Sequence, residues 1–127
     1  MGKAALVNID VEKGSEILKV LDDANVKVRV ALWLYSPDYE DWRLLLSSKD
    51  FDRTDLVEAY GLVNSALDAA GIALEQTPPI LILSMSSPFI RTLRKIFGKA
   101  KSVEGMRLGG QMIGDRFVDD AYVYRVS

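Results

Sequence analysis

The residues best suited to chemistry in this chain lie in a serine-rich loop and in the helix predicted after it. Ser84, Ser86 and Ser87 supply hydroxyl groups, and Arg91 and Arg94 supply guanidinium groups further along the helix. The loop follows a predicted parallel strand, and open α/β sheets bind ligands at the carboxyl ends of such strands. The free N–H groups of a helix N-terminus also favour anions. These residues therefore form a candidate anion-binding site for a phosphate or a carboxylate. The alternative is a capped helix after a tight turn, because no glycine-rich loop or P-loop lysine accompanies the serines.

A basic band overlaps this region. Residues 91–107 hold six cationic side chains against the single acid Glu104: Arg91, Arg94, Lys95, Lys99, Lys101 and Arg107. Such a band is typical of nucleic-acid binding. The chain as a whole is acidic, with a pI near 5.1, and Phe89 and Phe97 are expected in the core, where they cannot stack on bases. A solvated helix face with a charged loop is the alternative interpretation, so nucleic acid is a partner that we consider but do not favour.

Carboxylates gather between the two tryptophans. Asp38, Glu40 and Asp41 precede Arg43, and this order is similar to the acid and acid-x-lysine pattern of metal-dependent nucleases. Arginine does not readily lose its proton to act as a base, and these acids share one turn instead of facing strands. We therefore expect no metal site. The other acids are expected to be connector, cap and turn residues, with a weak calcium site as the alternative for the last three: Asp50, Asp52, Asp55, Asp115, Asp119 and Asp120.

The composition excludes several kinds of chemistry. The 127 residues include no cysteine and no histidine, which removes disulfides, thiolate nucleophiles and the commonest general base and metal ligand. We expect no cofactor. No apolar run approaches the ~20 residues of a membrane span, so we expect a protein that does not enter the membrane and lies in the cytoplasm.

The hydrophobic pattern predicts the elements that must position these side chains. Helical spacing with an Asp10 cap predicts a helix over 10–24, which Asn25 ends, and strict alternation predicts a strand over 26–35. Residues 42–48 resume as a strand, 54–70 form a helix capped by Asp52 or Thr54, and 80–83 form a strand buried on both faces and parallel to 44–46. Ser87 and Pro88 begin a helix that Gly98 ends. Two strands follow, so the order α-β-β-α-β-α-β-β predicts one α/β sandwich domain with a mixed sheet over residues 1–127.

Aromatic residues provide the candidate interface. Residues 32–46 are interpreted as a β-hairpin that carries Trp33 and Tyr35 on one strand face, and the last strand carries Tyr122 and Tyr124. These residue types are enriched in protein interfaces. A last strand at the open edge of the sheet would also pair with a second copy. The alternative is that helices cover these aromatic side chains.

Three segments, "VALWLYSPDYEDWRLLLSS", "SMSSPFIRTLRK" and "DDAYVYRV", resemble a set of short bacterial proteins of unknown function. The resemblance covers most of the chain and implies a bacterial intracellular domain, but it supplies no activity, ligand or catalytic residue. We therefore expect a small, non-enzymatic binding or interaction module that works with a protein partner or as a homodimer. The alternative is a metal-dependent nuclease-like or phosphate-ligand enzyme, or a nucleic-acid-binding accessory domain.

Overall fold

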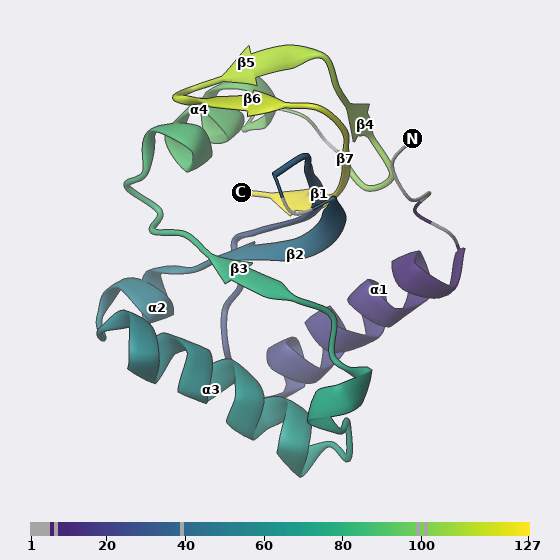
Figure 1. Ribbon diagram of the computed structural model, residues 1–127. Coiled ribbons are helices and arrows are strands. Elements are labelled where there is room, and N and C mark those ends of the chain that lie inside the picture. The colour runs from purple at the N-terminus through teal and green to yellow at the C-terminus, as the bar shows by residue number, and fades with distance from the viewer. Residues whose placement is uncertain (1–5, 7, 39, 99, 101) are drawn as a thin grey trace.

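The computed structural model describes residues 6, 8–38, 40–98, 100 and 102–127. Its central sheet has the strand order β3-β2-β1-β7-β4. Helices α1 (Asn8–Asp23) and α3 (Leu56–Ala69) lie on one side of the sheet. Helix α4 (Pro88–Phe97) and a two-stranded ribbon lie on the other side (Figure 1). The predicted single α/β domain with a mixed sheet is confirmed.

The centre of the sheet is strand β1 (Val30–Ser36), which pairs antiparallel with β2 (Asp41–Ser47) and with β7 (Ala121–Val126). The predicted hairpin is therefore confirmed, but the first strand begins at Val30 and not at residue 26. Asn25 adopts a φ of 64° and ends α1 as expected. Val28 packs on the α1 side of the sheet and Val30 on the α4 side, so the alternation of valines does not describe one continuous strand.

The predicted parallel pair is confirmed between β2 and β3 (Ile80–Ile82). The chain connects them through α2 (Lys49–Asp52), α3 and the 3₁₀ turn η1 (Leu74–Gln76). The N-cap of α3 is Asp55, which accepts a hydrogen bond from the N–H of Glu58, so the predicted caps Asp52 and Thr54 were wrong. β3 is an edge strand, and the Tyr60 hydroxyl accepts the outward N–H of Ile82 at 3.0 Å.

Helix α4 begins as predicted, since Ser87 accepts a hydrogen bond from the N–H of Ile90 and Pro88 occupies the first turn. One apolar residue of α4, Ile96, does not join its buried side and is 55% exposed. The last third forms more strands than expected. Strand β4 (Arg107–Leu108) pairs with β7, whereas β5 (Gln111–Ile113) and β6 (Arg116–Val118) form the separate ribbon over α4.

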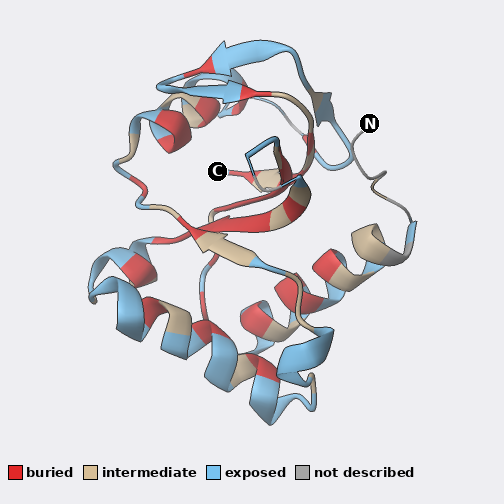
Figure 2. Ribbon diagram, viewed as in Figure 1, coloured by how far each residue is buried: buried red, intermediate tan, exposed pale blue. Residues whose placement is uncertain are grey.

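The two faces of the sheet bury separate hydrophobic clusters (Figure 2). The α1 side contains both tryptophans together with Leu44 and Leu46. The α4 side contains Leu32, Leu45, Phe89 and Val123. Because β1 is covered on both faces, its residues 30–35 are all buried. No helix within the described ranges is long and apolar enough to cross a membrane.

A β-bulge fixes α1 to the sheet. Ala31 pairs with Arg125 and Leu32 pairs with Val123, which leaves Tyr124 as the extra residue of β7. The Tyr124 hydroxyl donates to the carbonyl of Val11 at 2.5 Å and accepts the Trp33 indole N–H at 2.8 Å. We call this contact between α1, β1 and β7 the α1 seam: Val11, Gly14, Asp22, Trp33, Tyr124 and Arg125.

Candidate functional site

The predicted anion-binding serines are placed in a short, internally bonded loop. The hydroxyls of Ser84 and Ser86 lie 2.8 Å apart, and Ser87 is used to cap α4. The carboxylate of Asp52 accepts the backbone N–H of Met85 at 3.0 Å. This contact occupies one N–H group of the loop and places a negative charge beside it, which disfavours an anion there.

The N-terminus of α4 is covered by the turn of the β5–β6 ribbon. Gly114 has a φ of +62°, and a Cβ atom at this position would lie 2.6 Å from the carbonyl oxygen of Pro88 and 2.9 Å from the nitrogen of Phe89. The backbone of Gly114 therefore packs directly on the first turn of the helix. An anion bound there would compete with the protein's own ribbon for the same space.

The serines and the arginines of the predicted site line different hollows. Ser84 and Ser86 line a cleft of about 420 Å³ whose other lining residues are Phe51, Asp52, Thr54, Leu56 and Ile82. Arg91 and Arg94 line a hollow of about 380 Å³ with Lys95, Gly98 and Ser127. Among the described residues the two linings share no member. The structure thus keeps the two arginines together and does not join them to the serines.

The predicted interface aromatics lie mostly inside the protein. Trp33, Tyr35 and Tyr124 are each at most 7% exposed, under α1 and its neighbours, and Tyr122 is half-buried. β7 pairs with β1 on one side and with β4 on the other. The expectation that β7 forms an open edge was therefore wrong. As the alternative interpretation stated, helices cover Trp33, Tyr35 and Tyr124, so these side chains are not displayed to a partner in this structure.

The carboxylates considered for metal chemistry are dispersed or paired. Asp38 and Glu40 are exposed on the hairpin turn, and Asp41 lies 3.5 Å from the guanidinium of Arg43. Both carboxylate oxygens of Asp120 accept a hydrogen bond from Nη2 of Arg107, at 2.9 and 3.0 Å. Within the described part of the chain, no three acidic residues converge in a way that would hold a metal ion.

A pocket that the sequence did not reveal lies where the chain enters β1 and leaves β2. It has a volume of about 290 Å³ and a largely cationic lining: Asn25, Lys27, Arg29, Ser48, Lys49, Asp50 and Arg53. Local hydrogen bonds hold its walls together. Ser48 caps α2 and donates to the carbonyl of Lys27 at 2.6 Å, while Asp50 accepts the N–H of Lys27 at 3.1 Å. The loop before β1 is therefore anchored to the start of α2.

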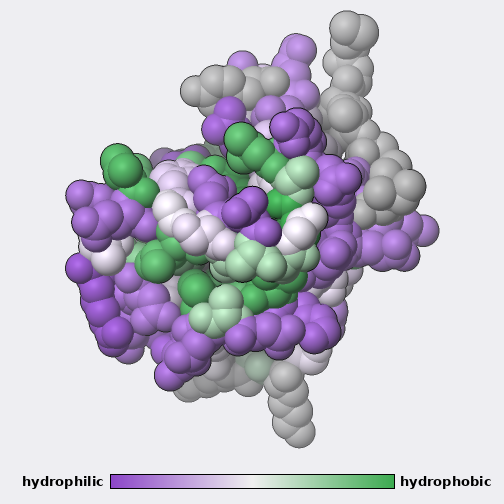
Figure 3. All heavy atoms as spheres, turned by 90° about the horizontal axis from the view of Figure 1, so that it is seen from below, coloured by the Kyte–Doolittle hydropathy of each residue, from purple (hydrophilic) through white to green (hydrophobic). Residues whose placement is uncertain are grey.

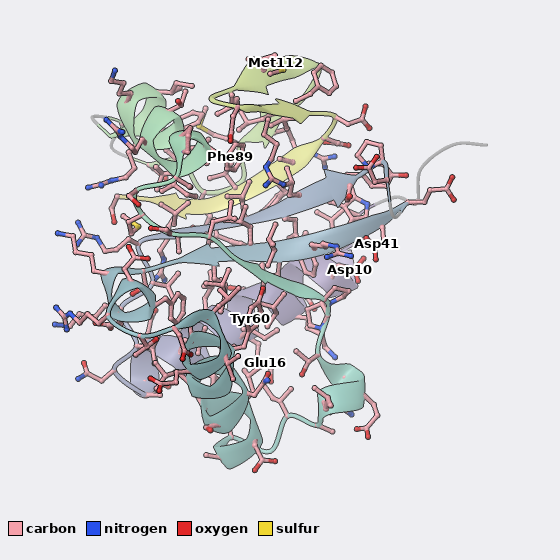
Figure 4. All side chains as sticks on the ribbon, turned by 60° about the vertical axis from the view of Figure 1, so that its left-hand side comes forward. Asp10, Glu16, Asp41, Tyr60, Phe89 and Met112 are labelled. Carbon is pink, nitrogen blue, oxygen red and sulfur yellow. The ribbon has the colours of Figure 1, made fainter. Side chains whose placement is uncertain are left out.

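This pocket adjoins the hollow of α4 through Ser127. The Ser127 hydroxyl accepts a hydrogen bond from Nε of Arg29 at 3.2 Å, and its N–H donates to the carbonyl of Arg29 at 2.9 Å. Arg29 lines the first pocket and Ser127 the second. Side chains that end in nitrogen project along the side of the molecule where α4 and α2 lie (Figure 4). We call the combined surface the basic face: Lys27, Arg29, Lys49, Arg53, Arg91, Arg94 and Lys95.

The basic face has few acids to balance its charge. Among the described residues, Asp50 is the one acidic side chain in either lining, and it lies 3.4 Å from Arg53. Five cationic side chains make no hydrogen bond or ion pair within the part of the chain that the structure describes: Lys27, Lys49, Arg91, Arg94 and Lys95. Seven cations against one acid create a positive potential on a protein whose net charge is −2.

The sequence indicated only half of this surface. Arg91, Arg94 and Lys95 belong to the predicted basic band, but Arg107 pairs with Asp120, and Lys99 and Lys101 lie outside the described residues. The other four cations come from the acidic first part of the chain. Their one local signal is the closeness of Lys27 to Arg29 and of Lys49 to Arg53.

Comparison with protein-family models, with curated proteins and with solved structures finds no match to this chain.

Proposed function

We propose that this protein is a small, non-enzymatic binding module that holds an anionic macromolecule on its basic face. The observation that carries the proposal is the convergence of seven cations from three separate segments, with one acidic side chain among the described lining residues. Like charges held together destabilise a folded protein unless a partner compensates them. A surface of this kind is therefore better explained by an opposite charge on a partner than by a contribution to stability.

A binding role also suits the way the other polar groups are used. Asp52 holds the loop after β3, Asp120 holds Arg107, and Asp41 lies beside Arg43. General acid–base catalysis needs such groups in reach of a substrate, with their protonation matched to the task. Here they are occupied by structural partners. We keep the cytoplasm as the proposed location, since a chain without cysteine suits a reducing compartment.

Cation-exchange chromatography at neutral pH tests this proposal, because a protein with a net charge of −2 is retained only through a local positive surface. We expect the wild type to be retained and Arg91→Gln/Arg94→Gln to elute at lower salt. Lys13→Gln/Lys19→Gln is the matched control, since it removes the same charge from α1, and we expect it to elute like the wild type. Passage of the wild type without retention, or an equal shift of both variants, contradicts the proposal.

A protein partner or a second copy of the chain is a second candidate, and it rests on a different surface. Val57 is 82% exposed at the start of α3, and its neighbour Leu56 is 58% exposed. Figure 3, which views the molecule from below, shows hydrophobic side chains among hydrophilic ones on this side. Exposed apolar patches mark many protein interfaces. If this patch forms a dimer, light scattering should give twice the chain mass for the wild type and the single chain mass for Val57→Lys.

A further inference from the structure

We infer that the anionic macromolecule is a nucleic acid, and that the basic face binds the phosphate backbone of a duplex without reading its base sequence. This inference rests on the proposed function and names the partner for the same surface. It is carried by three properties of the basic face: which residue types line it, how they are arranged and which types are missing from it.

The lining residues favour phosphate over an acidic protein surface. Four of the seven cations are arginines, whose planar guanidinium groups donate two parallel hydrogen bonds to phosphate: Arg29, Arg53, Arg91 and Arg94. Neither hollow has an aromatic or a large aliphatic side chain among its described lining residues. Protein–protein interfaces depend on buried aromatic and apolar anchors, whereas protein–DNA interfaces are more polar and much more positively charged. Ile96, the exposed apolar residue of α4, lines neither hollow.

The missing aromatics favour a duplex over a single strand. Proteins that bind single strands without sequence preference stack successive bases on aromatic side chains. Both tryptophans lie in the cluster on the α1 side of the sheet, and Phe89 and Phe97 are buried under α4. The exposed Phe117 lies on the ribbon and lines neither hollow. The basic face therefore offers charge to a backbone and no platform to unstacked bases.

The arrangement of the cations suits a rigid row of phosphates. Arg91, Arg94 and Lys95 are spaced i, i+3 and i+4 on α4, so their side chains leave the helix on one face. The second group, around Arg29 and Lys49, lies across Ser127 and is fixed by the contacts of Ser48 and Asp50. Hydrogen bonds to phosphate position a protein on DNA but carry no sequence information directly. Among the described lining residues, Asn25 is the one amide side chain, the group that pairs with adenine through two hydrogen bonds.

Fluorescence anisotropy of a short labelled duplex, titrated with the full chain at several salt concentrations, tests this inference. We expect the logarithm of the binding constant to fall linearly with the logarithm of the salt concentration, with a slope no steeper than about −6 for seven contacts. Each of Arg91→Gln and Lys49→Gln should make the slope shallower by about 1. A duplex of scrambled sequence should bind equally well. Lys13→Gln/Lys19→Gln should bind like the wild type, and circular dichroism confirms that each variant is folded.

Competition separates the possible failures. A single strand of the same length should displace the labelled duplex less well than an unlabelled duplex does, and polyglutamate should displace it least. If the single strand or polyglutamate competes as well as the duplex, the inference about duplex nucleic acid is overturned while the anionic-partner function stands. If the protein is retained on the cation exchanger but binds no duplex at low salt, the inference also fails alone. If it binds neither resin nor duplex, both proposals fail.

Discussion

Arg125 at the α1 seam and the two arginines of α4 on the basic face differ in whether an acid pairs with them. At the α1 seam, Arg125 donates two hydrogen bonds of 3.0 Å to Asp22 and a third of 3.2 Å to the carbonyl of Val28. This pairing lowers the pKa of the Asp22 carboxyl, chiefly through the hydrogen bond from Arg125, and raises that of the guanidinium. On the basic face, Arg91 and Arg94 have no such acid within the described residues. The comparison shows that an arginine that holds elements of the fold together is paired with an acid. Arginines without an acidic partner therefore indicate a surface that serves binding and not stability.

The largest effect is expected from breaking the close approach at the α1 seam. In Gly14→Ala the new Cβ atom would lie 2.3 Å from the Tyr124 hydroxyl, 2.8 Å from its ring carbon and 2.9 Å from the Trp33 nitrogen. Because the tyrosine is held by two hydrogen bonds, we expect a loss of about 1–3 kcal/mol in the free energy of unfolding. Gly61→Ala in α3 is the control, since its Cβ meets nothing within 4 Å, and it should stabilise by about 0.5–1 kcal/mol. Urea denaturation measures the free energy of unfolding of both variants. Equal effects would contradict the close packing of Gly14 against Tyr124 and Trp33.

Removing the Tyr124 hydroxyl at the α1 seam should lower the free energy of unfolding by a comparable or smaller amount. Tyr124→Phe leaves the buried indole N–H of Trp33 and the carbonyl of Val11 without this partner, which should cost about 1–3 kcal/mol. Burial raises the pKa of Tyr124 to about 12 from an ordinary value near 10. The unfolded state therefore ionises first, so this stability is complete below pH 10 and is lost as pH rises toward 12. Unfolding curves from pH 9 to 12 should show that fall in the wild type, beyond any fall in the variant.

The ion pair of the seam is expected to contribute less. Asp22 has a pKa lowered by Arg125, so its contribution is present above the ordinary carboxyl value of 3.8 and is lost as pH falls through the lower, folded value. The Asp22 side chain is 42% exposed, and solvent screening limits the effect of Asp22→Asn to less than about 1 kcal/mol. Denaturation at pH 7 and at pH 3 should show a smaller difference for the variant. A pH dependence identical to that of the wild type would argue against the pairing.

The smallest effect on stability is expected from the basic face. Neutralising Lys49, Arg91 and Arg94 together with glutamine should change the free energy of unfolding by no more than about 0.5 kcal/mol, and in the stabilising direction, because repulsion is relieved. Arg125→Gln should destabilise instead, since it removes the partner of Asp22. Parallel urea titrations sharpen the comparison. If the triple variant were destabilised as much as Arg125→Gln, the α1 seam and the basic face would not differ in the way proposed.

Residue patterns within a few positions of one another predicted the elements that such short-range patterns determine. Ser87 and Pro88 mark the start of α4, and the apolar run 80–83, which is short and bounded by turn residues, predicts the strand that the structure places at Ile80–Ile82. The prediction of strand bounds failed where the alternation of apolar residues continues beyond the strand itself. The alternating valines continue the strand pattern back to residue 26, although the loop after Asn25 turns Val28 toward α1. Helix α2 has four residues, which is too short to show a helical period.

The candidate site was less accessible to sequence reasoning because it depends on tertiary contacts. The bond from Arg29 to Ser127 joins residues 98 positions apart and brings the two halves of the basic face together. From the sequence pattern alone, Lys27 and Arg29 are expected on the solvent-exposed face of a strand in an acidic region. Conversely, the Ser84 loop looks like an anion site until the contacts of Asp52 and Gly114 are seen. Nothing in the spacing of the residues signals either contact.

The placement of the two tryptophans determines which structural changes the intrinsic fluorescence of this protein can detect. Trp33 and Trp42 are both buried in the hydrophobic cluster under α1, one bonded to Tyr124 and the other with its ring centroid 5.5 Å from that of Tyr35. Neither lines a hollow of the basic face. Intrinsic emission should therefore follow the detachment of α1 and the opening of the core, and should stay nearly constant when a ligand binds on the basic face. Titrations of the basic face consequently need a probe on the ligand.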